Sequence, residues 1–204
     1  HVLSRFGYSN FAYKLLLQET YPSWLYPVTK GATTIWERWD GIRTNGDFQA
    51  VTMNSFNHYA YGAIGDWMYR VMVGLDNEDG SVGYKKIRIR PHVGGGFTNA
   101  AATYETPYGK LSSGWKIEAG KVLMDVTIPA NTTATIYIPA TDPNAITESG
   151  NALSADIKVT GTENGYAIVN VGSGTYHFAA AKSATAMASI NVAEYVGKYK
   201  TDGG

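Results

Sequence analysis

The spacing of hydrophobic and polar residues along the chain changes its period once, near residue 80. Before this point apolar residues recur every three or four positions, which is typical of amphipathic helices. The pattern predicts one helix from Ser9 to Thr20, ended by Tyr21-Pro22, and a second helix from Ser55 to Leu75. The second helix is apolar on almost all sides, so it should be covered by other parts of the protein.

Beyond the polar cluster at residues 76–80, apolar and polar residues alternate, which is the period of half-buried antiparallel strands. Strands are predicted at residues 86–90, 122–128 and 134–138, around Ile168, and at residues 176–178. Turn signals at residues 118–120, 142–144 and 172–174 separate them at intervals suited to a β-sandwich. The expected fold class is therefore mixed, with a helical segment followed by an antiparallel β-sandwich.

The predicted organisation has three segments: helices in residues 1–80, a sandwich in 81–181, and a tail in 182–204 with a short helix near 192–199. Two helices alone cannot form a stable domain, because each has an apolar surface too wide for the other to cover. Glycines 62 and 65 inside the second helix each cost about 1 kcal/mol relative to alanine. A close approach by a neighbouring helix would explain both glycines. We therefore expect the chain to be a piece of a longer protein.

Composition narrows the classes of partner. Lysine plus arginine and aspartate plus glutamate both number 17, so a net charge of zero points to neither nucleic acid nor an anionic membrane. No apolar run approaches the roughly 18 residues of a membrane helix. The absence of cysteine excludes disulfides and thiolate metal sites. It leaves the compartment open, with a periplasmic or extracellular location slightly favoured over the cytoplasm.

Metals and other cofactors are not expected, because the four histidines lack the spacing of metal ligands. The chain is instead rich in aromatic residues, with 15 tyrosines and five tryptophans. Their rings combine a flat apolar face with a polar edge, which suits sugar binding. In the β half, Tyr104, Tyr108 and Trp115 could form a carbohydrate-binding face. Positions in the core or at the edges of a sandwich would account for them equally well.

The motif GATTIWERWD places Glu37 between Trp36 and Trp39. Aromatic neighbours could partly remove the carboxylate from water, which would raise its pKa toward values useful for proton transfer. The alternative is an ordinary surface ion pair of Glu37 with Arg38 or Arg43.

His58 lies near the start of the second predicted helix, where Ser55 or Asn57 is suited to be the N-cap. The positive end of a helix favours a neutral histidine, which offers one donor and one acceptor to a hydroxyl group. The alternative is a buried histidine with satisfied hydrogen bonds.

Three segments in this order carry a resemblance to a known family. They are YPSWLYPVTKGATTIWERWD, SFNHYAYGAIGDWMYR and TPYGKLSSGWKIEAGKVLMDVTIPANTTATIYIPA, and GSGTYHF follows them. Together they resemble the C-terminal part of bacterial α-L-rhamnosidases of glycoside hydrolase family 78. The resemblance extends over roughly residues 8 to 180.

The resemblance implies the last helices of an (α/α)6 catalytic barrel followed by a β-sandwich. It implies an inverting hydrolase that removes terminal rhamnose from glycosides or polysaccharides. Glu37 matches the general base, His58 a rhamnose-binding histidine, and Trp36 a neighbour in the pocket. Arg38 and Asp40 are expected to fix the loop, because an arginine facing a carboxylate can lock its rotamer. The family's general acid has no match here, so the expected partners are the substrate and the remainder of the catalytic domain.

Two other functions stay open at this point. The chain could act as an accessory β-sandwich for carbohydrate binding or stability, or it could belong to another (α/α)6 glycoside hydrolase. In each case the isolated chain is expected to lack turnover.

Overall fold

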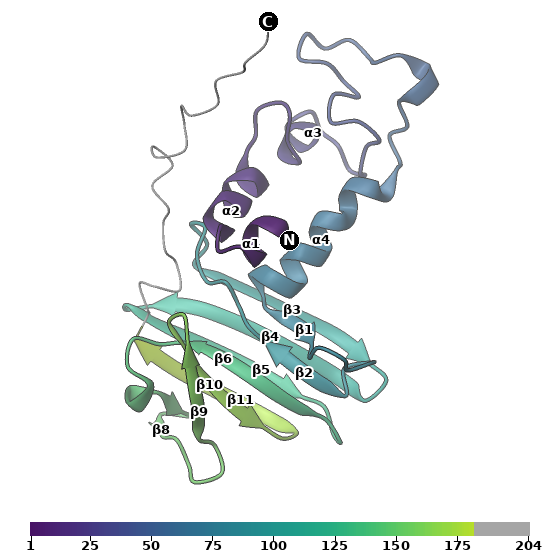
Figure 1. Cartoon of the computed structure of the whole chain (residues 1–204). Helices are drawn as coiled ribbons and strands as arrows, with labels where there is room; N and C mark the ends of the chain where they lie inside the picture. The colour runs from purple at the N-terminus through teal and green to yellow at the C-terminus, as the bar shows by residue number, and fades with distance from the viewer. Residues whose placement is uncertain (182–204) are drawn as a thin grey trace, which may run out of the picture.

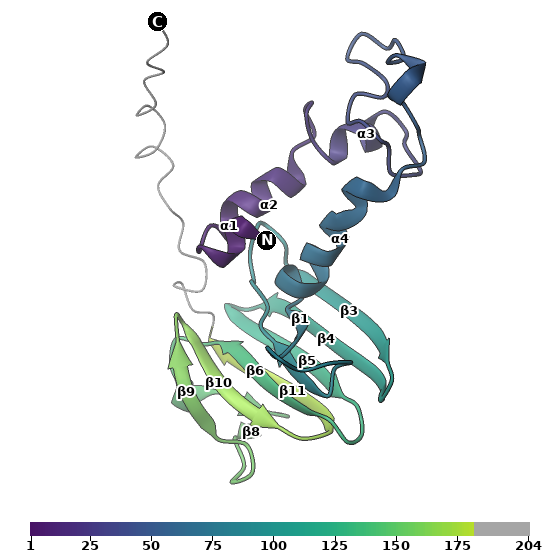
Figure 2. The same cartoon turned by 45° about the vertical axis from the view of Figure 1, so that its right-hand side comes forward.

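The computed structural model describes residues 1–181, which form a helical segment followed by a sandwich of two β-sheets (Figure 1). Helices α1 (Val2–Arg5) and α2 (Ser9–Leu17) lie beside the sandwich. The chain then runs away from the sandwich to α3 (Leu25–Thr29) and returns along the helix that contains α4 (Figure 2). The fold class predicted from the sequence is confirmed.

The returning helix is continuous but consists of three consecutive segments with different helical hydrogen bonding. It comprises η2 (Tyr59–Ala63), α4 (Ile64–Trp67) and the π-helical η3 (Met68–Met72), and a separate short turn, η1, spans Val51–Met53. The expected N-cap at Ser55 or Asn57 is wrong, because His58 occupies that position. The preceding residues pair with another part of the chain, since the Glu37 N–H donates to the Ser55 carbonyl at 2.8 Å. The first helix also ends earlier than predicted, at Leu17 rather than Thr20, because Gln18 is already extended.

The two sheets hold eleven strands in the described part of the chain. One sheet has the order β1-β2-β6-β10-β9 and the other the order β3-β4-β5-β11-β7-β8. The strands are β1 (Leu75–Asn77), β2 (Lys86–Ile89), β3 (Asn99–Thr106), β4 (Gly109–Glu118), β5 (Lys121–Ile128), β6 (Thr133–Pro139), β7 (Thr147–Glu148), β8 (Asn151–Ala152), β9 (Val159–Glu163), β10 (Tyr166–Val171) and β11 (Gly174–Ala181), with the turn η4 (Pro143–Ala145) between β6 and β7.

The strands predicted from alternation are confirmed as β2, β5, β6, β10 and β11. One pairing differs from the expected antiparallel arrangement, because β2 and β6 are parallel. The limits of the three predicted segments stay a prediction. The predicted tail, with its short helix near 192–199, lies outside the described residues.

The main core lies between the sheets. It is built from every second residue of the strands, on the faces where the two sheets meet. Examples are Ile87 and Ile89 in β2 and Ile136 and Ile138 in β6, all of which are fully buried. Burying such a side chain contributes roughly 1.5–3 kcal/mol. Trp115 belongs to this core and is 2% exposed, so of the two alternatives for this residue the core position is confirmed and the carbohydrate-binding face is wrong.

A second, smaller core joins the helical segment to the sandwich. Tyr13, Leu16, Trp67 and Met72 are buried together there. A Cβ on Gly95 would lie 2.1 Å from the ring of Tyr13, so only glycine allows the loop before β3 to pack this closely.

Hydrogen bonds strengthen the same junction. The Trp115 indole N–H donates to the Met72 carbonyl at 2.8 Å, and the Ser113 hydroxyl donates to the Val73 carbonyl at 3.2 Å. These carbonyls belong to the end of the returning helix, where the helix itself supplies no donors. The sandwich therefore satisfies the C-terminal end of that helix.

The close approach expected at the two helical glycines is not made within residues 1–181. A Cβ on Gly65 would meet no atom within 4 Å, and a Cβ on Gly62 would lie 3.7 Å from the Ile35 side chain. The helical glycines therefore leave open surface in this part of the protein.

The junction should make stability depend on pH through His92. Burial, followed by the nearby Arg90 charge, lowers the pKa of His92 from 6.5 to about 4. Its Nδ1 lies 2.7 Å from the Ser9 hydroxyl. Because the folded pKa is depressed, the full stability is present above pH 6.5 and is lost as the pH falls toward 4. We expect a loss on the order of 3 kcal/mol in the free energy of unfolding.

Denaturant unfolding at a series of pH values measures this loss. His92→Gln should flatten the profile between these two pKa values. Asn170→Gln, an exposed position of β10 whose side chain does not titrate, serves as the control and should keep the profile. An unchanged slope in His92→Gln would contradict the prediction.

Candidate functional site

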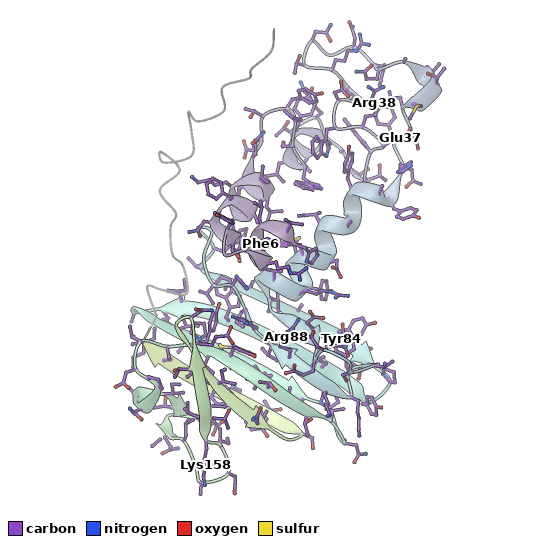
Figure 3. The ribbon with its side chains drawn as sticks, viewed as in Figure 1. Phe6, Glu37, Arg38, Tyr84, Arg88 and Lys158 are labelled. Atoms are coloured by element: carbon purple, nitrogen blue, oxygen red, sulfur yellow. The ribbon has the colours of Figure 1, made fainter. Side chains whose placement is uncertain are left out.

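The predicted site residues lie in the loop between α3 and the returning helix. This loop is at the end of the helical segment that is distant from the sandwich, where Glu37 and Arg38 are labelled in Figure 3. Two stretches of the loop run side by side: the His58 N–H donates to the Ile35 carbonyl at 2.8 Å, and the Thr34 hydroxyl donates to the Phe56 carbonyl. These bonds pair the stretch that carries Glu37 with the stretch that carries His58, so both residues belong to the same folded loop.

Glu37 is held by a reciprocal pair of hydrogen bonds with Ser55. Its own N–H donates to the Ser55 carbonyl, while its Oε2 accepts from the Ser55 N–H, both at 2.8 Å. Its second oxygen, Oε1, has no hydrogen-bond partner within the described chain. The side chain is therefore fixed in direction but keeps one oxygen free for a ligand or water.

The alternative of a surface ion pair for Glu37 is wrong for residues 1–181. Arg38 instead faces Asp40, with 3.6 Å between Nε and Oδ1. The second Asp40 oxygen accepts from the side-chain amide Nε2 of Gln49 at 2.5 Å, and the side-chain Oε1 of Gln49 accepts from Arg43 at 2.9 Å. Both arginines are thus engaged in a network beside Glu37.

Trp36 is buried, with 5% of its surface exposed. Its ring meets that of Phe56 edge to face at 4.9 Å between centroids. A Cβ on Gly41 would lie 3.2 Å from the Trp36 ring and 2.9 Å from Asn54 Oδ1, so the chain turns tightly against this ring. Trp36 therefore anchors the loop from the inside.

Trp39 is surrounded by aromatic rings, and its indole N–H is left without a hydrogen bond in residues 1–181. Its ring stacks on Tyr61 at 4.8 Å and meets Trp24 at 5.5 Å, while its buried Nε1 lacks a hydrogen-bond partner in the described part. Trp39 thus belongs to an aromatic cluster with Trp24 and Tyr61. That aromatic neighbours partly remove the Glu37 carboxylate from water stays a prediction.

His58 is exposed, so the alternative of a buried and satisfied histidine is wrong. Its Nδ1 accepts from the Ala60 N–H at a long 3.5 Å, which makes it the N-cap of η2. The ring lies parallel to that of Tyr59. The remaining nitrogen, Nε2, has no partner within residues 1–181 and can bind a hydroxyl group.

A depression of about 380 Å³ opens next to the Asp40 network. It is lined by Tyr21, Asp40, Arg43, Thr44, Asn45 and Gln49. The sequence did not single out Gln49, and it singled out Ser55 only as an N-cap, not as a partner of Glu37. Nothing in their local pattern reveals a partner, because the pairing depends on how distant parts of the loop come together.

Two further features of residues 1–181 bear on other functions. No helix there is long and apolar enough to cross a membrane. No group of three histidine, aspartate or glutamate side chains in the same residues is placed to hold a metal ion.

Two family models match the chain. Residues 1–72 match the bacterial alpha-L-rhamnosidase 6 hairpin glycosidase domain, and residues 74–153 match the bacterial alpha-L-rhamnosidase C-terminal domain. The two matches meet where the returning helix ends and β1 begins.

Similar whole proteins were also found. An alpha-L-rhamnosidase from Streptomyces avermitilis is 43% identical over 178 residues, which are 87% of this chain and 16% of that protein. One from Formosa agariphila is 46% identical over 145 residues, which are 71% of this chain and 15% of that protein. The crystal structure of Streptomyces avermitilis alpha-L-rhamnosidase complexed with L-rhamnose matches with a TM-score of 0.81 at 42% identity, over 87% of this chain and 16% of that one. The chain thus spans about one sixth of the length of these relatives.

Proposed function

Because this chain belongs to the bacterial α-L-rhamnosidase family, we propose that it is the C-terminal portion of an enzyme that hydrolyses terminal α-L-rhamnosyl residues of glycosides or polysaccharides. It contributes the end of the catalytic barrel and the sandwich that follows. The names of its relatives support this substrate class. The remainder of the catalytic domain is its partner in forming the complete site.

The observation that carries the proposal is the free Oε1 of Glu37 beside an Oε2 fixed by Ser55. A general base needs one oxygen that is aimed by its surroundings and open to water. In the proposed inverting reaction, Oε1 takes a proton from water as the water oxygen bonds to the anomeric carbon. The glycosidic bond breaks at the same time, and the leaving oxygen takes a proton from a carboxylic acid.

That carboxylic acid lies outside this chain. Inverting glycosidases keep their two carboxyl groups roughly 6.5–9.5 Å apart, which leaves room for the water. Asp40 does not take this role in our proposal, because both of its oxygens are engaged by Arg38 and Gln49. The Arg38–Asp40 pair fixes the loop that carries Glu37, and buried Trp36 forms its inner support.

A panel of aryl glycosides tests the proposed function on the complete enzyme. We expect kcat/KM for p-nitrophenyl α-L-rhamnoside to exceed that for the α-D-glucoside by at least about a hundredfold, because a pocket that pairs with sugar hydroxyls rejects other arrangements. NMR of the first sugar anomer released tests inversion. A preference for glucosides would favour another (α/α)6 hydrolase, and no hydrolysis of any glycoside would favour an accessory module.

His58 should contribute to rhamnose binding. We expect His58→Ala to raise KM about tenfold or more with a smaller change in kcat. The variant lacks Nε2, so a hydroxyl group of the bound sugar would lose its hydrogen bond to this nitrogen. His58→Asn is the matched control, since asparagine is a good N-cap but lacks the ring. Kinetics and thermal unfolding are measured for both. If Asn restores both KM and stability, the role of His58 is only to cap the helix.

A further inference from the structure

A cluster of three tyrosines covers one part of the sandwich. Tyr104 lies in β3, Tyr108 in the turn between β3 and β4, and Tyr84 in the loop before β2. The rings of Tyr84 and Tyr104 are 5.1 Å apart between centroids, and Lys85 Nζ lies 5.1 Å from the centre of the Tyr108 ring. Tyr104 is 44% exposed and Tyr108 is 38% exposed, while Tyr84 packs partly against the core.

The hydroxyl groups of these tyrosines differ from those of the tyrosines used in packing. The hydroxyls of four other tyrosines donate to backbone carbonyls: Tyr13, Tyr26, Tyr166 and Tyr176. In residues 1–181 the hydroxyls of Tyr84, Tyr104 and Tyr108 make no hydrogen bond. The cluster therefore presents ring faces and unused polar groups together.

The backbone is constrained to place this cluster. Tyr84 has a φ of +64°, which is rare for a bulky residue. The Asn77 side chain holds it there by accepting from the Tyr84 N–H at 2.7 Å. Lys85 is fixed as well, because its Nζ donates to the Asn131 carbonyl. The backbone of Tyr84 and the ammonium group over the Tyr108 ring are thus held in place before any ligand arrives, which lowers the entropy lost on binding.

We propose that Tyr84, Tyr104 and Tyr108 form a second carbohydrate-binding surface, which holds a neutral oligosaccharide chain away from the catalytic loop. A flat ring with a polar edge matches the apolar face and hydroxyl rim of a sugar. The cation at this cluster, Lys85, is already engaged by the Asn131 carbonyl and the Tyr108 ring, which favours an uncharged ligand over an ionic one. Figure 3 shows Tyr84 on the sandwich, well separated from Glu37. The choice of a sugar ligand draws on the proposed function.

Affinity gel electrophoresis of the complete enzyme tests this surface. The probe is carboxyl-reduced rhamnogalacturonan, a neutral polymer whose rhamnosyl residues are internal, so that a site for terminal rhamnose does not retain it. We expect the double variant Tyr104→Ala/Tyr108→Ala to bind about tenfold more weakly than the wild type, because two aromatic contacts are removed. Its kcat/KM for p-nitrophenyl α-L-rhamnoside should be unchanged.

Tyr69→Ala is the matched control, since Tyr69 is also 44% exposed but lies on the returning helix. Three results overturn the inference: the polymer fails to retard the wild-type protein in the gel, the double variant is retarded as strongly as the wild type, or Tyr69→Ala reduces the retardation equally. So does a double variant that only unfolds at a lower temperature, which would indicate that these rings pack against the rest of the protein. An inactive wild type whose retardation still depends on the two tyrosines would support this surface and overturn the proposed function.

Discussion

Glu37→Gln in the complete enzyme should lower kcat for an aryl rhamnoside by at least about a hundredfold. Glutamine keeps the size of the side chain and an oxygen that can accept from the Ser55 N–H, so the loop should keep its structure. The amide cannot take a proton from water at neutral pH, so the step that activates water is lost. Stopped assays of p-nitrophenol release measure the change.

Glu19→Gln is a suitable control for Glu37→Gln. Glu19 is an exposed carboxylate of the same helical segment and is not part of the candidate site. Its replacement should leave kcat and KM unchanged. Turnover retained in Glu37→Gln would falsify the assignment of Glu37 as the base, whereas an equal loss in both variants would point to a general effect of charge on the enzyme.

Gly74→Ala should destabilise the protein by more than about 3 kcal/mol, which places it among the most damaging single substitutions. Gly74 connects the end of the returning helix to β1 and has a φ of +81°. A Cβ there would lie 2.2 Å from the backbone carbon of Arg90 and 2.2 Å from the nitrogen of Pro91. Backbone atoms cannot rotate away, so the strands on either side must separate. Denaturant unfolding gives the change in free energy.

Gly80→Ala separates this clash from backbone strain. Gly80 has a similar φ of +76°, but a Cβ there would meet no atom within 4 Å. We expect Gly80→Ala to cost about 1–2 kcal/mol, the penalty for an L-residue in the left-handed region. If both variants lost the same free energy of unfolding, the contact of Gly74 with residues 90 and 91 would not contribute to the loss.

The sequence predicted strands well where one face is apolar and the other polar. Strands β5 and β6 have this alternation, and the structure buries the expected residues, such as Met124 and Ile136. Strand β3 has no such pattern, because its sequence NAAATYET has small residues on both faces. Its partner β4 was missed with it. These two strands form because β3 pairs with β4 and β4 with β5, and such pairing is not visible in the local sequence.

Single residues in the site were harder to predict than strands. The sequence left Trp115 open between a carbohydrate-binding face and the sandwich core. The structure buries it, with its indole N–H on the Met72 carbonyl, a contact between residues 43 positions apart. The same limit applies to Ser55, whose backbone orients Glu37. Glu37 and His58 could be selected because their residue types carry chemistry. The groups that orient them have no chemical signature, and only the folded loop brings them together.

The order of strands in the sandwich also has a consequence for synthesis of the protein. Strand β11, the last described strand, pairs along its length with β5, and β2 pairs with β6 more than 40 residues later in the chain. Such distant pairings form slowly, because a long loop must close before they are stabilised. The sheet that contains β5 cannot be completed until Ala181 has left the ribosome. The two donors to the end of the returning helix, Ser113 and Trp115, lie in this same sheet, so we expect that helix end to reach its final packing only after residues up to 181 have been synthesised.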